Sequence, residues 1–163
     1  DNFSDVDNPY YPLHRIKYFN YKIFNLIEAN VNGPGLVPTA FAIRQFLTLE
    51  APFKAFFGLP IARERRYFIN NGEVQCWHPY WPEDAIQFNL LNPPDNWQDL
   101  LKTINTYQVD ETILVTYAER LGKVLNDYWS VDFAYTRDKQ WYFIDAAQGI
   151  DSWHDPSCIY AAR

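Results

Sequence analysis

The stretch WSVDFAYTRDKQWYFIDA, residues 129–146, decides the fold of this chain. Its first six and last six residues are rich in aromatic and β-branched side chains, and a polar pentapeptide, residues 136–140, lies between them. This pattern is typical of two strands joined by a turn. The sequence therefore predicts a hairpin with strands at residues 129–134 and 141–146.

Each predicted strand has one acid in an otherwise apolar segment, Asp132 in the first and Asp145 in the second. An ionised carboxylate in such surroundings is costly unless a cation or hydrogen bonds compensate it. Two acids on adjacent strands could converge on Mg²⁺, which takes carboxylate oxygens and leaves positions for phosphate. We hypothesise a nucleotide-metal site here, and the alternative is that either acid pairs with Arg137 or Lys139.

Composition places the chain among folded, water-soluble proteins. Its 163 residues are enough for one domain with a sizeable core, and 48% are hydrophobic while 21% are charged. The net charge of −6 argues against binding to a nucleic-acid backbone, which needs clustered Lys and Arg. No apolar run is long enough to span a membrane or to form a secretory signal, so no membrane partner is expected.

The two cysteines, Cys76 and Cys158, lie far apart in the sequence and match no CxxC or CxxH spacing. Neither a zinc site nor a disulfide framework is predicted from this spacing. We interpret them as reduced thiols of a cytoplasmic protein.

The order of predicted elements indicates the fold class. An amphipathic helix is followed by strands, then by two helices, and finally by the hairpin at residues 129–146. This order predicts an α+β fold with a mostly antiparallel sheet and helices packed on one face. The expected helices cover residues 17–30, 97–105 and 110–127, and the expected strands cover 40–47, 60–69 and 73–78, with Asn70-Asn71-Gly72 as a hairpin turn.

The charged segment Arg63-Glu64-Arg65-Arg66 is the second candidate site. Because side chains of a strand alternate between faces, Arg63 and Arg65 share one face, and Glu64 and Arg66 share the other. Arginine suits phosphate binding because its planar fork donates two parallel hydrogen bonds. The alternative is a solvated sheet face held by salt bridges.

The histidines and serines predict no covalent chemistry. We interpret His78, in the rigid segment His78-Pro79-Tyr80-Trp81-Pro82, as a packed and hydrogen-bonded side chain, and we expect surface roles for His14 and His154. No Ser-His-Asp or Cys-His arrangement and no GxSxG motif can be argued from the spacing. A covalent hydrolase is therefore not expected.

Several segments taken in order resemble the C-terminal lobe of ATP-grasp enzymes, over about residues 37–150. Their order and spacing carry the resemblance more than any one of them does. The segments are residues 46–50 (FLTLE), 60–68 (PIARERRYF), 78–82 (HPYWP), 131–133 (VDF) and 144–145 (ID).

The resemblance implies a role for each matching position. Gln45, Phe46 and Leu47 match the hinge strand that contacts adenine, and Glu50 matches an acid at the ribose. Arg63, Glu64 and Arg66 lie in the strand that approaches the phosphates, with Glu64 and Arg66 as the catalytic pair. Asp132 and Asp145 match two magnesium ligands, while the usual third ligand, an Asn, is replaced by Ala147.

The resemblance also implies an activity. An ATP-grasp-like ligase would use ATP and Mg²⁺ to activate a small-molecule or peptide carboxylate as an acyl phosphate. Residues 1–36 form a lead-in and helix that are too short for the preceding lobe with its Gly-rich loop and lysines. We therefore expect a preceding lobe or a partner chain to complete the site around residues 37–163. The alternatives are a catalytically inactive ATP-grasp-like binding or structural module, and an aromatic-rich interaction domain without nucleotide.

Overall fold

The computed structural model describes residues 44–90, 92–106 and 111–160. The chain divides into two compact units, residues 1–45 and 46–163, and the architecture below belongs to the second unit. This unit is α+β with antiparallel sheets, as the sequence predicts. The expected helix at residues 17–30 lies outside the described residues.

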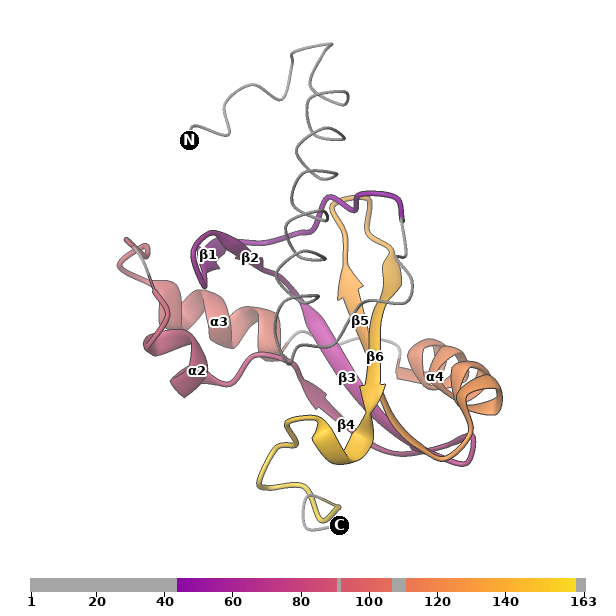
Figure 1. Cartoon of the computed structure of the whole chain (residues 1–163). Helices are drawn as coiled ribbons and strands as arrows, with labels where there is room; N and C mark the ends of the chain where they lie inside the picture. Colours follow the sequence, from indigo (N-terminus) through magenta and orange to yellow (C-terminus); the bar gives the residue numbers. More distant parts are fainter. Residues whose placement is uncertain (1–43, 91, 107–110, 161–163) are drawn as a thin grey trace, which may run out of the picture. The chain divides into compact units, whose positions relative to one another are not determined.

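A four-stranded antiparallel sheet forms the centre of the unit (Figure 1). The predicted hairpin is confirmed, and its strands pair from Trp129 with Gln148 to Tyr135 with Trp141, with one register shift between Asp132 and Phe133. In spatial order the strands are β4 (Glu73–Pro79), β3 (Glu64–Asn70), β5 (Tyr128–Tyr135) and β6 (Trp141–Gln148).

The turn between β3 and β4 is the one that the Asn-Asn-Gly sequence predicts. Asn71 and Gly72 both have positive φ angles, 49° and 87°. A two-residue hairpin loop with both residues in this region matches the right-handed twist of the strands, and Asn-Gly adopts it at little cost. The turn therefore fixes the pairing of Asn70 with Glu73.

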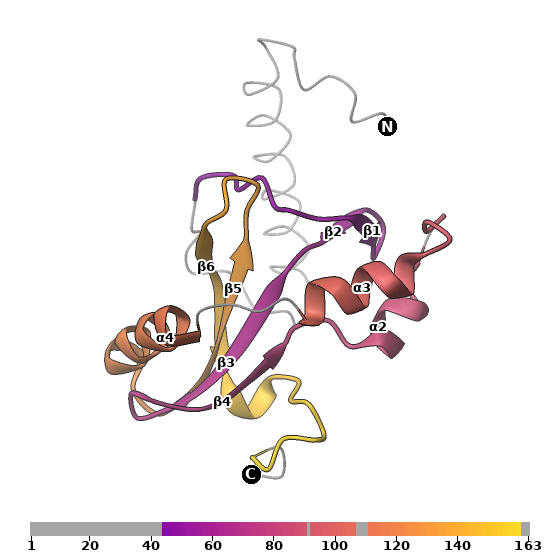
Figure 2. The same cartoon turned by 180° about the vertical axis from the view of Figure 1, so that it is seen from behind.

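Helix α4 (Glu111–Leu125) covers one face of this sheet, called here the helix face and defined by Tyr67, Ile69, Val131 and Phe133 (Figure 2). Leu114 and Ala118 of α4 pack against these residues. The helix can approach closely because residue 122 is glycine: a Cβ there would lie 2.4 Å from Ile69 Cγ2. Apolar burial on this face is the main stabilising term of the sheet.

A second core forms beside the sheet, where the β1–β2 hairpin meets two helices. Its buried residues include Phe53, Ile61, Trp81, Ile86 and Leu101. The elements are β1 (Phe53–Ala55), β2 (Leu59–Ile61), α2 (Glu83–Gln87) and α3 (Trp97–Thr106).

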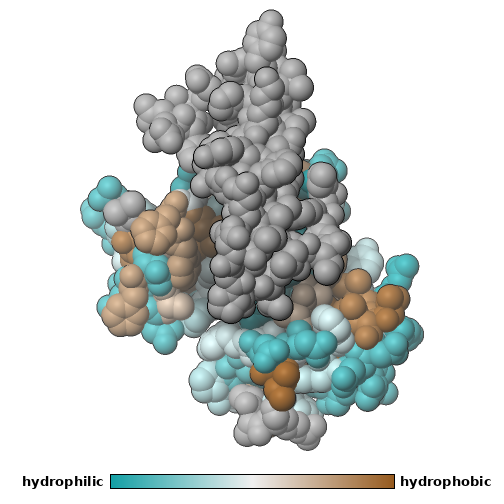
Figure 3. Space-filling view, viewed as in Figure 1, coloured by the Kyte–Doolittle hydropathy of each residue, from teal (hydrophilic) through white to brown (hydrophobic). Residues whose placement is uncertain are grey.

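Large apolar side chains remain exposed around this second core. Phe57 and Phe88 are 98% and 83% exposed, and Leu59 is also exposed. In the space-filling view, hydrophobic residues gather on the left of the molecule, where the β1–β2 hairpin and α2 lie (Figure 3).

The structure corrects the expected elements at three places. Residues 44–47 of the expected strand 40–47 have no regular structure, and only Leu49 forms an isolated bridge, to Thr136. The expected strand 60–69 is interrupted at residues 62–63 and belongs to two different sheets. Strand β1 and helix α2 were not expected, because three and five residues are too few for a periodic pattern.

Among the described residues, no helix has the length and apolar character needed to cross a membrane.

Candidate functional site

Four titratable side chains form a row across the face of the sheet opposite α4. Arg66 on β3 pairs with His78 on one side and with Asp132 on the other, and Asp132 pairs with Asp145 on β6. Directly paired residues project from the same face of a sheet. We call this the polar face and define it by His78, Arg66, Asp132 and Asp145.

Arg66 and Asp132 form a buried bidentate ion pair at the centre of the row. Arg66 Nε donates to Asp132 Oδ1 and Nη2 donates to Oδ2, both at 2.8 Å. Burial alone would lower the pKa of Arg66, but the hydrogen bonds and charge of Asp132 outweigh burial and raise it. Burial raises the pKa of the Asp132 carboxyl, and the guanidinium acts against this rise. Such a pair is stable only while both partners are present.

Asp145 differs from Asp132 because it is exposed. Its Oδ1 accepts a hydrogen bond from the backbone N–H of Ala146 at 2.9 Å. The charge of Asp145 adds to the rise that burial causes in the pKa of Asp132. The hairpin therefore presents one paired acid and one acid open to solvent on adjacent strands.

Glu64 begins β3 on the same face as Arg66 and is 6% exposed. Burial, followed by the charge of Asp132, raises the pKa of Glu64 to about 8, although Trp81 and Arg66 act in the opposite direction. The carboxyl group is therefore mostly protonated at neutral pH. In this state it can donate a hydrogen bond to an anion.

His78 is a packed side chain, as the sequence predicts. Its Nδ1 lies 2.8 Å from the carbonyl oxygen of Pro79, and its Nε2 accepts from the N–H of Asp155 at 3.3 Å. This arrangement requires a neutral ring with the proton on Nδ1, in agreement with a pKa that burial lowers. His78 therefore links β4 to the C-terminal segment through its hydrogen bond with Asp155.

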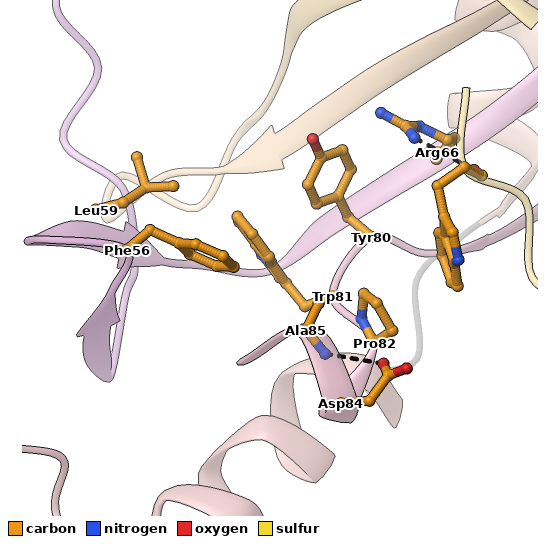
Figure 4. Close-up of a pocket in the computed structure, with 9 residues that line it drawn as sticks. Phe56, Leu59, Arg66, Tyr80, Trp81, Pro82, Asp84 and Ala85 are labelled. Atoms are coloured by element: carbon orange, nitrogen blue, oxygen red, sulfur yellow. Dashed lines mark hydrogen bonds between the residues drawn. The ribbon is translucent and has the colours of Figure 1, made fainter. Parts of the chain in front are cut away.

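A cavity of about 530 Å³ lies beside the guanidinium of Arg66 (Figure 4). Tyr80 and Trp81 stand next to each other in its wall, and the Arg66 guanidinium carbon lies 4.5 Å from the centre of the Tyr80 ring. The cavity thus combines an aromatic wall with one fixed cation. It is lined by Phe56, Leu59, Arg66, Tyr80, Trp81, Pro82, Asp84, Ala85 and Trp153.

Glu50 and Arg63, predicted to contact the nucleotide, lie next to each other. Arg63 Nη1 is 3.4 Å from Glu50 Oε2, and Lys139 Nζ is 3.1 Å from Glu50 Oε1. The segment before them follows the end of β5, because Arg137 N donates to Thr48 O and Glu50 N donates to Tyr135 O.

Of the predicted hinge residues, Leu47 is half-buried and Phe46 is 83% exposed. Gln45 is exposed and is the last residue of the first unit.

The structure brings together Arg66, Asp132, Asp145 and Glu64, four of the candidate site residues, and it adds residues that sequence reasoning missed. His78 enters the row because β4 pairs with β3, and Trp153 enters the cavity wall because the C-terminal segment returns to the sheet. Trp153 also accepts a hydrogen bond at its carbonyl from Arg66 Nη1, at 3.3 Å. A strand-pairing prediction could have found His78, but no local pattern marks Trp153.

The fold and site define an α+β domain with a charged row on the sheet face opposite its covering helix. Comparison of the chain with protein-family models, with curated proteins and with solved structures gave no match.

Proposed function

We propose that the polar face binds Mg-ATP, as in the C-terminal lobe of an ATP-grasp-like ligase that activates a carboxylate as an acyl phosphate. The observation that carries the proposal is the row of His78, Arg66, Asp132 and Asp145, to which four strands each contribute one side chain. The buried pair of Arg66 and Asp132 is expensive for folding alone, and Asp145 adds an exposed acid on the same face. They suit a ligand that combines phosphates with a divalent cation.

Asp132 and Asp145 are the residues that would hold Mg²⁺. They offer hard carboxylate oxygens from directly paired positions, and a register shift follows immediately after Asp132. β-Bulges are over-represented next to functional sites, where they redirect side chains. Asp145 is open to solvent, so the donor set fits a partly hydrated magnesium ion.

Arg66 has two alternative anionic partners in this proposal. In the structure it neutralises Asp132, and it also lines the cavity. Releasing Asp132 would leave both charges buried and unpaired unless phosphate and a cation replace the lost partners. We infer that Arg66 turns from Asp132 to phosphate when the nucleotide binds.

Glu64 contributes to the proposed site as a neutral hydrogen-bond donor. Because its pKa is raised to about 8, it presents a neutral carboxyl group beside Arg66 at neutral pH. A neutral carboxyl donates a hydrogen bond to a phosphate oxygen, whereas an ionised one repels it. When bound, Mg-ATP supplies the phosphoryl group that converts the substrate carboxylate into an acyl phosphate, which a nucleophile then attacks.

A second candidate is a module that binds nucleotide without turnover. The observation that favours it is Ala147, which the resemblance to ATP-grasp enzymes aligns with the third metal ligand and which pairs with Ser130. The Ser130 hydroxyl is already within 2.7 Å of the Ser152 hydroxyl. The two candidates differ in catalysis and share the binding site.

Calorimetric titration of the 163-residue chain with ATP, with and without Mg²⁺, tests the binding site. We expect Mg²⁺-dependent binding that Asp145→Asn weakens by about tenfold or more, since a ligand to the metal is lost. Asp145 is exposed, so this change leaves the fold intact. The matched control is Asp127→Asn, which removes an exposed acid at the start of the same hairpin.

A second readout places the site on the sheet. Mn²⁺, which takes the same oxygen ligands, should broaden the amide NMR signals of Asp132 and Asp145 when it is added with ATP. The signal of Leu114, in the helix that covers the other face, should broaden much less. The proposal is contradicted if the affinity for ATP is the same with and without Mg²⁺, or if Asp145→Asn binds with the affinity of the unchanged chain. The absence of ATP binding by this chain also contradicts it.

A further inference from the structure

Two cysteines and a histidine meet at the edge of the polar face, although the spacing in the sequence predicts no zinc site. Cys76 is on β4, and His154 and Cys158 are on the segment that follows β6. The two sulfurs and a ring nitrogen all lie within 4.8 Å of one another, and Cys76 Sγ is 3.3 Å from His154 Nε2. Both cysteines are free thiols. Among the described residues, this is the one group of three His, Cys, Asp or Glu side chains with such spacing.

Packing and hydrogen bonds hold the C-terminal segment against the sheet, and this fixes His154. The His154 ring stacks on Phe68, with ring centres 3.8 Å apart and planes 18° from parallel. On one side of it the Ser152 hydroxyl contacts Ser130, and on the other side Asp155 N donates to His78 Nε2. The imidazole is therefore oriented by groups outside the cluster.

A turn brings Cys158 back to His154. Cys158 N donates to Asp155 O at 2.9 Å, and the Asp155 carboxylate accepts from the N–H and hydroxyl of Ser157 at 2.8 and 2.6 Å. The resulting His-x₃-Cys spacing, joined to a distant strand cysteine, resembles the ligand spacing of protein zinc sites. The three donors are thus brought together by backbone geometry.

The donor set decides which ion fits. Thiolate and imidazole are preferred by Zn²⁺, with bonds of about 2.3 Å to sulfur and about 2.0–2.1 Å to nitrogen. Tetrahedral geometry with these bonds places the donor atoms roughly 3.5–3.8 Å apart. The cluster, with all separations within 4.8 Å and one of 3.3 Å, needs only small shifts to reach this spacing. Mg²⁺ prefers oxygen and does not compete for this site.

We propose that Cys76 Sγ, Cys158 Sγ and His154 Nε2 bind one Zn²⁺ ion, which fastens the C-terminal segment to β4. Binding releases the two thiol protons, and water completes the fourth position. A disulfide between Cys76 and Cys158 is the competing outcome. The metal accounts for the oriented imidazole as well as for the two sulfurs, whereas a disulfide leaves the imidazole without a role.

The position of this site gives the ion a structural effect on the cavity. Trp153 precedes His154, lines the cavity and accepts a hydrogen bond from Arg66 Nη1. An ion on His154 and Cys158 therefore fixes one wall of the cavity and one contact of Arg66. The proposal of a zinc site does not rest on the proposed nucleotide binding, and its test does not use ATP.

Cobalt substitution in the reduced 163-residue chain tests the donor set. We expect one equivalent of Co²⁺ to bind with thiolate-to-cobalt charge-transfer absorption and the visible bands of a tetrahedral site, and Zn²⁺ to displace it. Cys158→Ser and His154→Gln should each lower Zn²⁺ affinity by about 100-fold or more, since each removes a direct ligand. Ile159→Ala, at an exposed position next to Cys158, is the matched control and should bind as the unchanged chain does. Failure of the reduced chain to bind Zn²⁺ at micromolar concentration, or cobalt binding without the charge-transfer band, overturns the proposal.

The rate of thiol alkylation in the unchanged chain tests the site without relying on the folding of any variant. Stoichiometric Zn²⁺ should slow alkylation of both thiols by about tenfold or more, and a chelator should restore the rate. Equal alkylation rates with and without Zn²⁺ contradict the site. A Cys76–Cys158 disulfide that forms in air in the presence of saturating Zn²⁺ also contradicts it and identifies the pair as a redox couple.

Discussion

The two faces of the four-stranded sheet are built from the same strands by opposite physical means. The helix face buries Tyr67, Ile69, Val131 and Phe133 under α4, and its stability comes from apolar contact. The polar face buries Arg66 and Asp132, which are tolerated only because each compensates the other. One face is therefore stabilised by apolar packing, and the other contains a buried ion pair that requires both of its members.

The largest effects should come from removing single members of each face. Asp132→Ala leaves Arg66 buried without its ion-pair partner, and Phe133→Ala leaves a cavity; each should lower the free energy of unfolding by about 3–5 kcal/mol. Denaturation with urea measures both. A second substitution separates the faces: adding Arg66→Met to Asp132→Leu should restore most of the stability. If the double variant stays as unstable as Asp132→Ala, buried charge does not govern the polar face.

The polar face should also make the stability of the protein depend on pH in the neutral range, through Glu64. Folding raises the pKa of Glu64 from 4.5 to about 8, so the folded protein retains a proton that the unfolded chain has lost in this range. Stability is therefore full at low pH and should fall by about 1 kcal/mol per pH unit between about pH 5 and pH 8.

Glu64→Gln should abolish this contribution and raise the free energy of unfolding at about pH 8 by roughly 3 kcal/mol. Urea denaturation across this pH range gives the slope. Glu73→Gln, at an exposed position of β4, is the control and should keep the original slope. A Glu64→Gln slope equal to that of the unchanged chain would show that Glu64 is ionised in the folded protein.

A smaller effect tests the close approach of α4 on the helix face. In Gly122→Ala the new Cβ meets Ile69 Cγ2 at 2.4 Å and Gly72 Cα at 3.0 Å. We expect a loss of about 1–2 kcal/mol, because overpacking outweighs the higher helix propensity of alanine. Thermal unfolding with Lys123→Ala as the exposed neighbour provides the comparison. A stabilised Gly122→Ala variant would mean that the helix can move away from the sheet freely.

The smallest effect should come from an ion pair outside both faces. Lys139 is 62% exposed in its contact with Glu50, so Lys139→Met should change the free energy of unfolding by less than about 1 kcal/mol. The remaining effect should vanish in high salt. A loss comparable to that of Asp132→Ala would contradict the view that burial decides the cost of a missing partner.

The sequence predicts the parts of this fold that depend on neighbouring residues. The hairpin of β5 and β6, the Asn-Gly turn and helices α3 and α4 all follow from local periodicity and turn chemistry. The expected strand at residues 40–47 shows the limit, because residues 44–47 have strand-like composition but no partner strand in the described residues. Strand formation depends on tertiary pairing more than on propensity.

The candidate site, like the fold, was predictable only where it depends on neighbouring residues. Asp132 opposite Asp145 follows from the hairpin, and Glu64 beside Arg66 follows from alternation. The pairing of Arg66 with Asp132 joins residues 66 positions apart, and Cys76 meets His154 across 78 positions. Such contacts depend on register between distant segments, which no local pattern encodes.

The register shift beside Asp132 places residues 143 and 145 of the partner strand on opposite faces of the sheet. Two residues apart on a regular strand, their side chains would share a face, yet Phe143 pairs with Phe133 of the helix face and Asp145 pairs with Asp132 of the polar face. Ile144 is the extra residue at this shift. Before Ile144 the odd-numbered residues of β6 lie on the helix face of the sheet, and after it the odd-numbered residues lie on the polar face. The length of this strand, counted to a single residue, is as much a part of the site as the acid that it carries.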